Sequence, residues 1–136
     1  MKSFSLLLLV LACTWISCKK NKVSPAQSQL QGNYKGTLRS DTKVTGGDSV
    51  VLLSNVVAVS INGNLYHSSS SDFEISRGSY TTSNGDLLFI DSVPHPAYYN
   101  WNILLAGRFT QSKKGDSLVW TKTFGPVSYI YTIKKQ

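Results

Sequence analysis

Apolar and polar residues alternate with a period of two along most of the chain from residue 30 onward. The first such segment, 30–39, places Leu30, Tyr34 and Leu38 on one face and polar side chains on the other. This alternation predicts a β-strand with one buried side and one solvated side. The two glycines of the segment share the apolar face, which indicates a close approach of backbones or a sharply coiled strand.

Turn signals divide the rest of the chain into similar short segments. The pairs Asn62-Gly63 and Asn84-Gly85 predict tight hairpins, because both residue types tolerate positive φ. Residues 50–53 fit either a strand buried on both sides or a single helical turn, and 101–110 is expected to be a strand. The connections expected from polar and glycine-rich positions are 40–48, 62–63, 68–71, 77–78, 84–85, 92–100, 112–116 and 125–126.

This pattern predicts eight or nine short strands in an all-β fold. Sequential antiparallel pairing is the economical topology. A row of that length has two exposed edges, and closure into a barrel removes them. We therefore predict a single small antiparallel up-and-down barrel of about eight strands, with a two-sheet β-sandwich as the alternative.

The N-terminal segment has a different character. A lysine at position 2 precedes an apolar run that includes 6–11. The run is shorter than the ~20 residues that cross a bilayer. A charged start, a brief apolar middle and a small residue before a cut predict a removed secretory signal. A retained N-terminal anchor helix is the alternative.

The end of this segment resembles the lipobox of bacterial lipoproteins, in which a small residue precedes an essential cysteine. Cys18 follows Trp15-Ile16-Ser17, and Cys13 follows Val10-Leu11-Ala12. We favour Cys18, since Ser-Cys-Lys-Lys before a polar stretch resembles many lipoprotein termini, and Cys13 is the alternative. The resemblance implies a thioether-linked diacylglycerol and a further chain such as palmitate, and two or more chains anchor a protein stably. A disulfide between the two cysteines is the other interpretation.

Three parts of the chain follow from this. Residues 1–17 are the expected signal peptide, 18–29 a flexible polar tether, and 30–136 the barrel domain. The domain has no cysteine, so disulfides cannot stabilise it. The lipoprotein resemblance implies export to the cell envelope and attachment to a bacterial membrane, which we expect to be the outer membrane.

The charge of the chain is positive, at +7. Ten of the fourteen basic residues and all seven acidic residues lie from residue 30 onward, so the domain itself is about +3. The basic residues are scattered and mostly occupy turns and strand ends. A nucleic-acid site needs a basic stripe interleaved with aromatics, so no nucleic-acid partner is predicted. The tether lysines either contact anionic head groups or are simply solvated.

Two short patterns resemble bacterial lipocalin-like domains of the calycin group. The segment 30–34 is similar to the opening Gly-X-Trp strand of that family, with Tyr34 in place of Trp. The closing pattern at 115–120, followed by 129–133, resembles the end of small lipocalin-like lipoproteins. The chain is shorter than a full lipocalin and lacks its C-terminal helix. The resemblance implies ligand binding inside the barrel, although small barrels are often filled by their own side chains.

The sequence offers few groups for chemistry. A serine run and Asp72 follow His67, but a triad needs spatial convergence and an oxyanion hole, and the sequence signals neither. His95 lies between two prolines, without other metal-ligand types at a suitable spacing. We predict no enzyme, no cofactor and no metal. An envelope hydrolase that uses His67 or a carboxylate pair is the alternative.

The best candidates for ligand binding are Tyr98, Tyr99 and Trp101, in a long loop beside two prolines. Aromatic loops at a barrel mouth suit recognition of a sugar, peptide or lipid. The alternative is that Tyr99 and Trp101 fill the barrel end as core. The sequence thus predicts a non-enzymatic, membrane-anchored module that binds a small apolar or aromatic ligand or another envelope protein.

Overall fold

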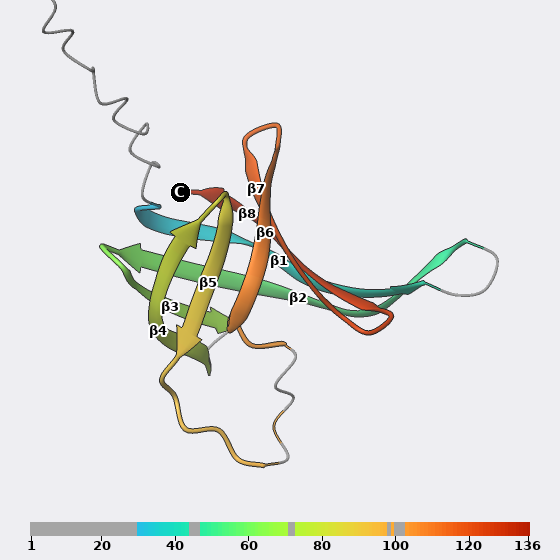
Figure 1. The fold of residues 1–136 in the computed structure, drawn as a ribbon, viewed down its shortest axis with the longest axis horizontal. Coiled ribbons are helices and arrows are strands. Elements are labelled where there is room, and N and C mark those ends of the chain that lie inside the picture. The colour runs from blue at the N-terminus through green and yellow to red at the C-terminus, as the bar shows by residue number, and fades with distance from the viewer. Residues whose placement is uncertain (1–29, 44–46, 71–72, 98, 100–102) are drawn as a thin grey trace, which may run out of the picture.

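The computed structural model describes residues 30–43, 47–70, 73–97, 99 and 103–136. Eight strands pair antiparallel in sequence order, and β1 closes against β8 to form a single barrel (Figure 1). The predicted up-and-down barrel of about eight strands is therefore confirmed, and the sandwich alternative is wrong. The strands are β1 (Gly32–Lys43), β2 (Ser49–Asn62), β3 (Leu65–Ser70), β4 (Phe73–Ser83), β5 (Asp86–Asp91), β6 (Gly107–Lys114), β7 (Ser117–Phe124) and β8 (Val127–Lys135).

Glycine-containing turns join four of the strand pairs. Asn84 and Gly85 both have positive φ, 53° and 88°, as the predicted hairpin requires. Gly63, Gly115 and Gly125 each take the first position of a two-residue turn with φ near 60°. The first of these turns is shifted by one residue from the prediction, because Asn62 still pairs with Leu65. Within the described residues, no helix is long and apolar enough to cross a membrane.

Aromatic rings fill the centre of the barrel. The ring of Phe89 packs against those of Tyr66, Tyr80, Phe109 and Trp120, with centroids 4.9–5.7 Å apart. Edge-on and tilted rings at such distances stabilise a core beyond their area alone. The buried apolar residues come from all eight strands and two neighbouring segments: Leu30, Tyr34, Leu38, Val57, Val59, Ile61, Tyr66, Ile75, Tyr80, Leu87, Phe89, Leu104, Leu105, Phe109, Trp120, Tyr129, Tyr131 and Ile133.

The predicted connections 40–48 and 112–116 are partly strand, since β1 continues to Lys43 and β6 to Lys114. Two further predicted connections are strand in all their described residues. The serine run continues β3 to residue 70, with Ser68 and Ser70 buried inside the barrel. Ser68 shares a hydrogen bond with Ser76 at 2.9 Å, and Ser70 donates to the Val56 carbonyl at 2.8 Å. Inward serines satisfied by such bonds keep the strand alternation although they are polar. The sequence prediction of a loop was therefore wrong.

The predicted turn at Arg77 and Gly78 is likewise the interior of β4. A Cβ at Gly78 would lie 1.9 Å from the carbonyl oxygen of Ile90 on β5. A Cβ at Gly36 would lie equally close to the carbonyl of Thr132 on β8. These glycines permit close strand contact, which confirms for Gly36 the close approach expected from the sequence.

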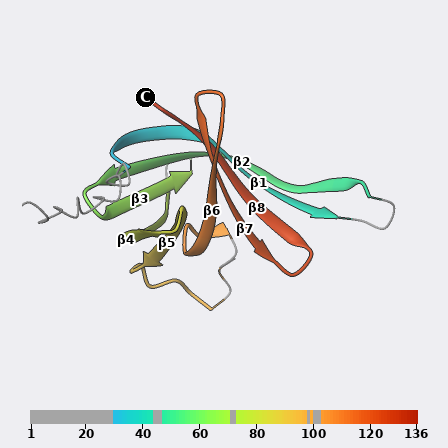
Figure 2. The same ribbon diagram turned by 45° about the horizontal axis from the view of Figure 1, so that its top comes forward.

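The hairpin of β1 and β2 extends well beyond the barrel wall (Figures 1 and 2). In this extension Val50, Val51 and Leu52 are 47–57% exposed. Ser40 pairs with Leu53 and the next residue of β1 pairs with Val51, so Leu52 forms a β-bulge. The segment is strand, but neither its predicted burial on both sides nor the helical-turn alternative is correct.

The expected strand at 101–110 begins only at Gly107. Residues 103–106 instead lie across one end of the barrel, where Leu104 and Leu105 are fully buried. The apolar positions read as strand from the sequence therefore close the barrel end, and this closure is the centre of the site described next.

Candidate functional site

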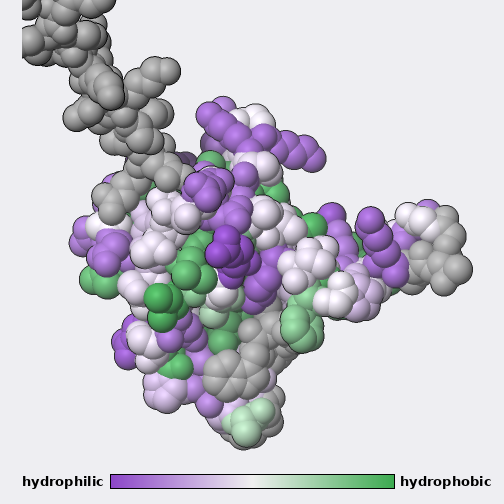
Figure 3. All heavy atoms as spheres, viewed as in Figure 1, coloured by the Kyte–Doolittle hydropathy of each residue, from purple (hydrophilic) through white to green (hydrophobic). Residues whose placement is uncertain are grey.

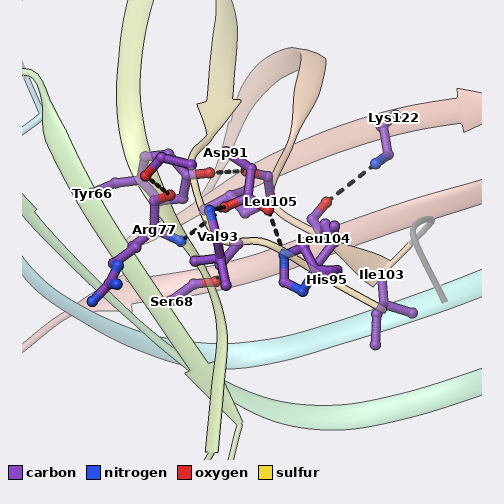
Figure 4. A network of polar contacts seen from close by, with 12 residues as sticks. Tyr66, Ser68, Arg77, Asp91, Val93, His95, Ile103, Leu104, Leu105 and Lys122 are labelled. Carbon is purple, nitrogen blue, oxygen red and sulfur yellow. Dashed lines mark hydrogen bonds and ion pairs between the residues drawn. The ribbon is translucent and has the colours of Figure 1, made fainter. Parts of the chain in front are cut away.

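Residues 103–106, here called the capping segment, are held by side chains that reach from the barrel interior to the backbone carbonyls of this segment. Tyr131 donates to the Ile103 carbonyl at 2.7 Å, and Tyr66 donates to the Leu105 carbonyl at 2.6 Å. Lys122 donates to the carbonyls of Leu104 and Ala106 at 3.2 and 3.1 Å. Each of the four successive carbonyls thus has a partner from the barrel. Figure 4 shows Lys122 and Tyr66 approaching the segment from different strands.

Lys122 is an unexpected cation at this end of the barrel. It is half-buried, and its Nζ lies 5.2 Å from the ring centre of Phe109 and 5.7 Å from that of Tyr129. Burial lowers the pKa of the ammonium from 10.5 to about 8. The carbonyls and ring faces favour the charged form and offset part of this desolvation. The inward position of Lys122 could have been predicted from the sequence, because Lys122 continues the inward-facing alternation of Leu118 and Trp120.

Burial also acts on the two tyrosines that hold the capping segment. Desolvation raises the pKa of Tyr131 and of Tyr66 well above the usual value of 10. Both phenols therefore remain neutral donors to carbonyls at physiological pH. Their arrangement suits a structural clamp, since neither phenolic proton is shared with a carboxylate among the described hydrogen bonds.

A buried Asp–His pair holds the chain that enters this closure. The Asp91 carboxylate lies 2.6 Å from Nε2 of His95, and the side chains are only 8% and 5% exposed. The other oxygen of Asp91 accepts bonds from the backbone N–H groups of Arg77 and Val93 (Figure 4). One carboxylate thus ends β5, ties the loop to β4 and fixes the imidazole. Sequence reasoning missed this pair, although its four-residue spacing was visible.

The predicted aromatic candidates lie next to this pair. Tyr99 packs on His95 with ring centres 4.6 Å apart, and its hydroxyl is buried without a hydrogen-bond partner in the described structure. Burial, followed by the charge of Asp91, raises the pKa of Tyr99. Its ring packs against the hydrophobic core. This agrees with the alternative in which Tyr99 fills the barrel end. Tyr98 and Trp101 lie outside the described residues.

The other predicted residues are not brought into a common site. Cys18 and Cys13 lie outside the described residues. His67 is exposed on β3, opposite Ser60 and Arg77, whereas its neighbour Ser68 points inward. In the described part of the chain, no three His, Cys, Asp or Glu side chains are grouped so that they could hold a metal ion.

Two grooves lie on the outer face of the barrel. One of about 420 Å³ runs over the outer face between Leu65 and Ile90. Another, of about 240 Å³, lies where Val56 and Ala58 of β2 meet Ser69 of β3, with Lys35 of β1 also in its lining. Inside, the residues that would line a ligand cavity are the packed aromatic rings. Figure 3 shows the mixed outer surface, with hydrophobic patches between hydrophilic ones.

The second groove leads to an open sheet edge. β2 pairs with β3 only at 58–62, so within the described chain its segment 49–57 is paired on one side only, by β1. The Val56 carbonyl points to the open side, since it accepts the Ser70 hydroxyl there. In a β-strand, the N–H and C=O of one residue point toward the same neighbouring strand, and those of the residues two positions before and after it point the same way. We call 53–57 the open edge of β2.

The exposed aliphatic side chain of the open edge is Val56, whereas Val57 is buried and Leu53 is partly buried. Val56 is 55% exposed, and the segment 49–57 carries no charged residue. Such an edge is a template for another strand, and proteins usually protect it with charges, proline or bulges. Here only the bulge at Leu52 interrupts it.

Comparison of the chain with protein-family models, with curated proteins and with solved structures gave no match.

Proposed function

We propose that this protein is a lipid-anchored module of the bacterial cell envelope that binds another envelope protein through its outer surface, without catalysis. The observation that carries this proposal is the packing of the barrel interior, where Phe109 and Trp120 are fully buried against Phe89, and Tyr131 packs against Phe109. Among the described residues, these rings occupy the centre where the lipocalin-like resemblance implies an internal ligand. We therefore place the binding role on the outside.

The open edge of β2 is the surface best suited to this role. An added strand would pair with the backbone groups of Ser54 and with the N–H of Val56, whose carbonyl already accepts the Ser70 hydroxyl, and would cover the exposed side chain of Val56, as in β-strand addition. The occupant we propose is an extended, mainly aliphatic segment of a partner protein, since segment 49–57 itself carries no charge and Lys35 lies in the adjoining groove. Every second side chain of the partner segment would point to the same face of the sheet, and the fit of these side chains to the surface would supply specificity.

A backbone substitution tests this edge. Val56→Pro removes the N–H on the open side, and that side of an edge strand tolerates proline. Val56→Ala keeps the N–H and serves as the matched control. A photo-reactive residue at position 54 should cross-link one envelope protein in cells, and Val56→Pro should abolish the cross-link while Val56→Ala retains most of it. Equal cross-linking in both variants would refute strand addition.

The anchor is tested separately. Cys18→Ala should release the domain from membranes or leave the precursor unprocessed, as followed by flotation and mass. If Cys13→Ala has this effect and Cys18→Ala does not, the other cysteine carries the lipid. If neither substitution matters, the lipoprotein assignment is wrong. Native mass spectrometry of the detergent-extracted protein should find no ligand retained in the barrel, and a bound lipid at one-to-one stoichiometry would contradict the filled interior.

A further inference from the structure

The strand register brings together lysines that are far apart in the sequence. Lys35 of β1 pairs directly with Lys134 of β8, and Lys134 pairs in turn with Ser117 of β7. Ser117 pairs with Lys114 of β6, so one row across four strands contains three lysines. All three are exposed on the outer face. We call Lys35, Lys134 and Lys114 the basic row.

This row is electrostatically unfavourable for the isolated domain. Like charges directly opposite each other on neighbouring strands destabilise a sheet. The described ion pair within reach is Lys134 to Asp116 at 3.2 Å, and the Asp116 side chain is 81% exposed. Solvent-exposed pairs of this kind contribute little. The placement therefore favours a binding role for the row over a stabilising one.

The basic row lies at the end of the barrel where the domain begins. β1 starts there and β8 ends there, as do the turns after β2, β4 and β6, because successive connections alternate between the ends of an up-and-down barrel. Gln31 fixes this start by two hydrogen bonds between its side chain and the backbone of Gly63. Figure 1 shows the β6–β7 hairpin and the C-terminus at this end, and Figure 3 shows hydrophilic side chains covering that hairpin.

The net charge of the domain is concentrated at this end. Besides the basic row, Lys113 and Lys135 lie there, against the two acids Asp86 and Asp116. The remainder of the sequence from residue 30 contains five basic and five acidic residues. The surplus of three charges therefore belongs to the end that follows the tether, and the lysines at 19, 20 and 22 precede it in the chain.

We infer that the basic row and its neighbouring lysines form a docking surface for anionic lipid head groups, which orients the barrel on the membrane with its β6–β7 hairpin toward the bilayer. This inference rests on the lipid anchor proposed above. The proposed tether allows this end to reach the bilayer, where basic residues are attracted to a negative surface within a Debye length. Orientation, and not attachment, is what the row adds.

Lysine acetylation of the full lipidated protein measures this orientation. The protein is reconstituted in vesicles of phosphatidylcholine, with or without phosphatidylglycerol, and treated with a water-soluble acetylating reagent. Labelling of Lys114 and Lys134, relative to Lys43 at the other end of β1, should fall about threefold or more in the anionic vesicles. High salt should restore it. Unchanged ratios, or equal protection of Lys43, would overturn the inference.

Charge variants and flotation separate the two proposals. Lys35→Gln with Lys134→Gln should abolish the protection of Lys114, whereas Arg39→Gln with Arg77→Gln, which also removes two charges and keeps Lys43 as the reference, should preserve it. Loss of protection in both pairs would overturn the inference. Flotation of the protein with anionic but not neutral vesicles would refute the anchor and support the basic row. Flotation with neither vesicle would refute both.

Discussion

Lys122 makes the stability of the barrel depend on pH in a direction that can be worked out from its surroundings. Its pKa is about 8 in the folded protein because burial disfavours the ammonium, against 10.5 in the unfolded chain. Between these values the unfolded state binds more protons, so the free energy of unfolding rises as the pH rises. The full difference corresponds to ~3 kcal/mol. Since Lys122 is only half-buried, solvent screening reduces the expected rise to about 1–2 kcal/mol between pH 7 and 10.

The tyrosines act in the opposite direction at higher pH. Burial raises the pKa of Tyr66 and Tyr131 above the unfolded value of 10. The stability that they contribute is therefore fully present below pH 10 and is lost as the pH rises further. Together with Lys122, they predict a stability maximum near pH 10, which is above the range where maximal stability is usual.

Urea unfolding at a series of pH values, followed by tryptophan fluorescence, measures this profile. A chain that starts at residue 19 is suitable, because every described strand and buried residue lies from residue 30 onward. Lys122→Met should remove the rise between pH 7 and 10 and retain the loss above pH 10. A flat wild-type profile from pH 7 to 10, or the same rise in Lys122→Met, would refute the assignment of the lowered pKa to this lysine.

Two further predictions concern packing and the capping segment. Gly78→Ala should destabilise the barrel by about 2–4 kcal/mol, because its Cβ would meet the Ile90 carbonyl at 1.9 Å, whereas Ser79→Ala should change the urea midpoint little. A midpoint for Gly78→Ala equal to that of Ser79→Ala would contradict the close contact. Tyr131→Phe should cost about 1–3 kcal/mol, since it leaves the Ile103 carbonyl without its phenol donor. It should also speed proteolysis within 92–106, and unchanged cleavage would show that the bond does not hold the capping segment.

The strand pattern was predictable because alternation and turn chemistry are local properties. The turn at Asn84 and Gly85 needs only two residues that accept positive φ, and both have it. Ser68 and Ser70 were misread because their inward burial depends on partners supplied by β4 and β2. Gly78 was misread because the neighbour that requires a glycine is the Ile90 carbonyl, on another strand. A single sequence does not contain these cross-strand contacts.

The site could be predicted only in part for a similar reason. The loop with Tyr99 was visible as an aromatic segment, but its role at the barrel end follows from packing on His95 and the core. The basic row was invisible, because the residues that read as scattered lysines become neighbours only once the register of β1, β8, β7 and β6 is known. Charge counted along a chain and charge arranged on a sheet are different quantities.

The two proposed surfaces are compatible because the topology places them at different distances from the tether. β1 starts at the basic end and has 12 residues, so at the usual rise per residue it spans up to about 40 Å. The open edge of β2 lies opposite the middle of this span, since Val57 pairs with Gly36 and Leu53 pairs with Ser40. A barrel oriented by the basic row would therefore hold the Leu53 end of the open edge farther from the lipid than its Val57 end, so that position 54 stays accessible to a partner. It follows that Lys35→Gln with Lys134→Gln should weaken the cross-link from position 54 in cells without removing it, whereas Val56→Pro should remove it and leave the acetylation pattern intact. The reverse result would mean that the edge, and not the row, faces the membrane.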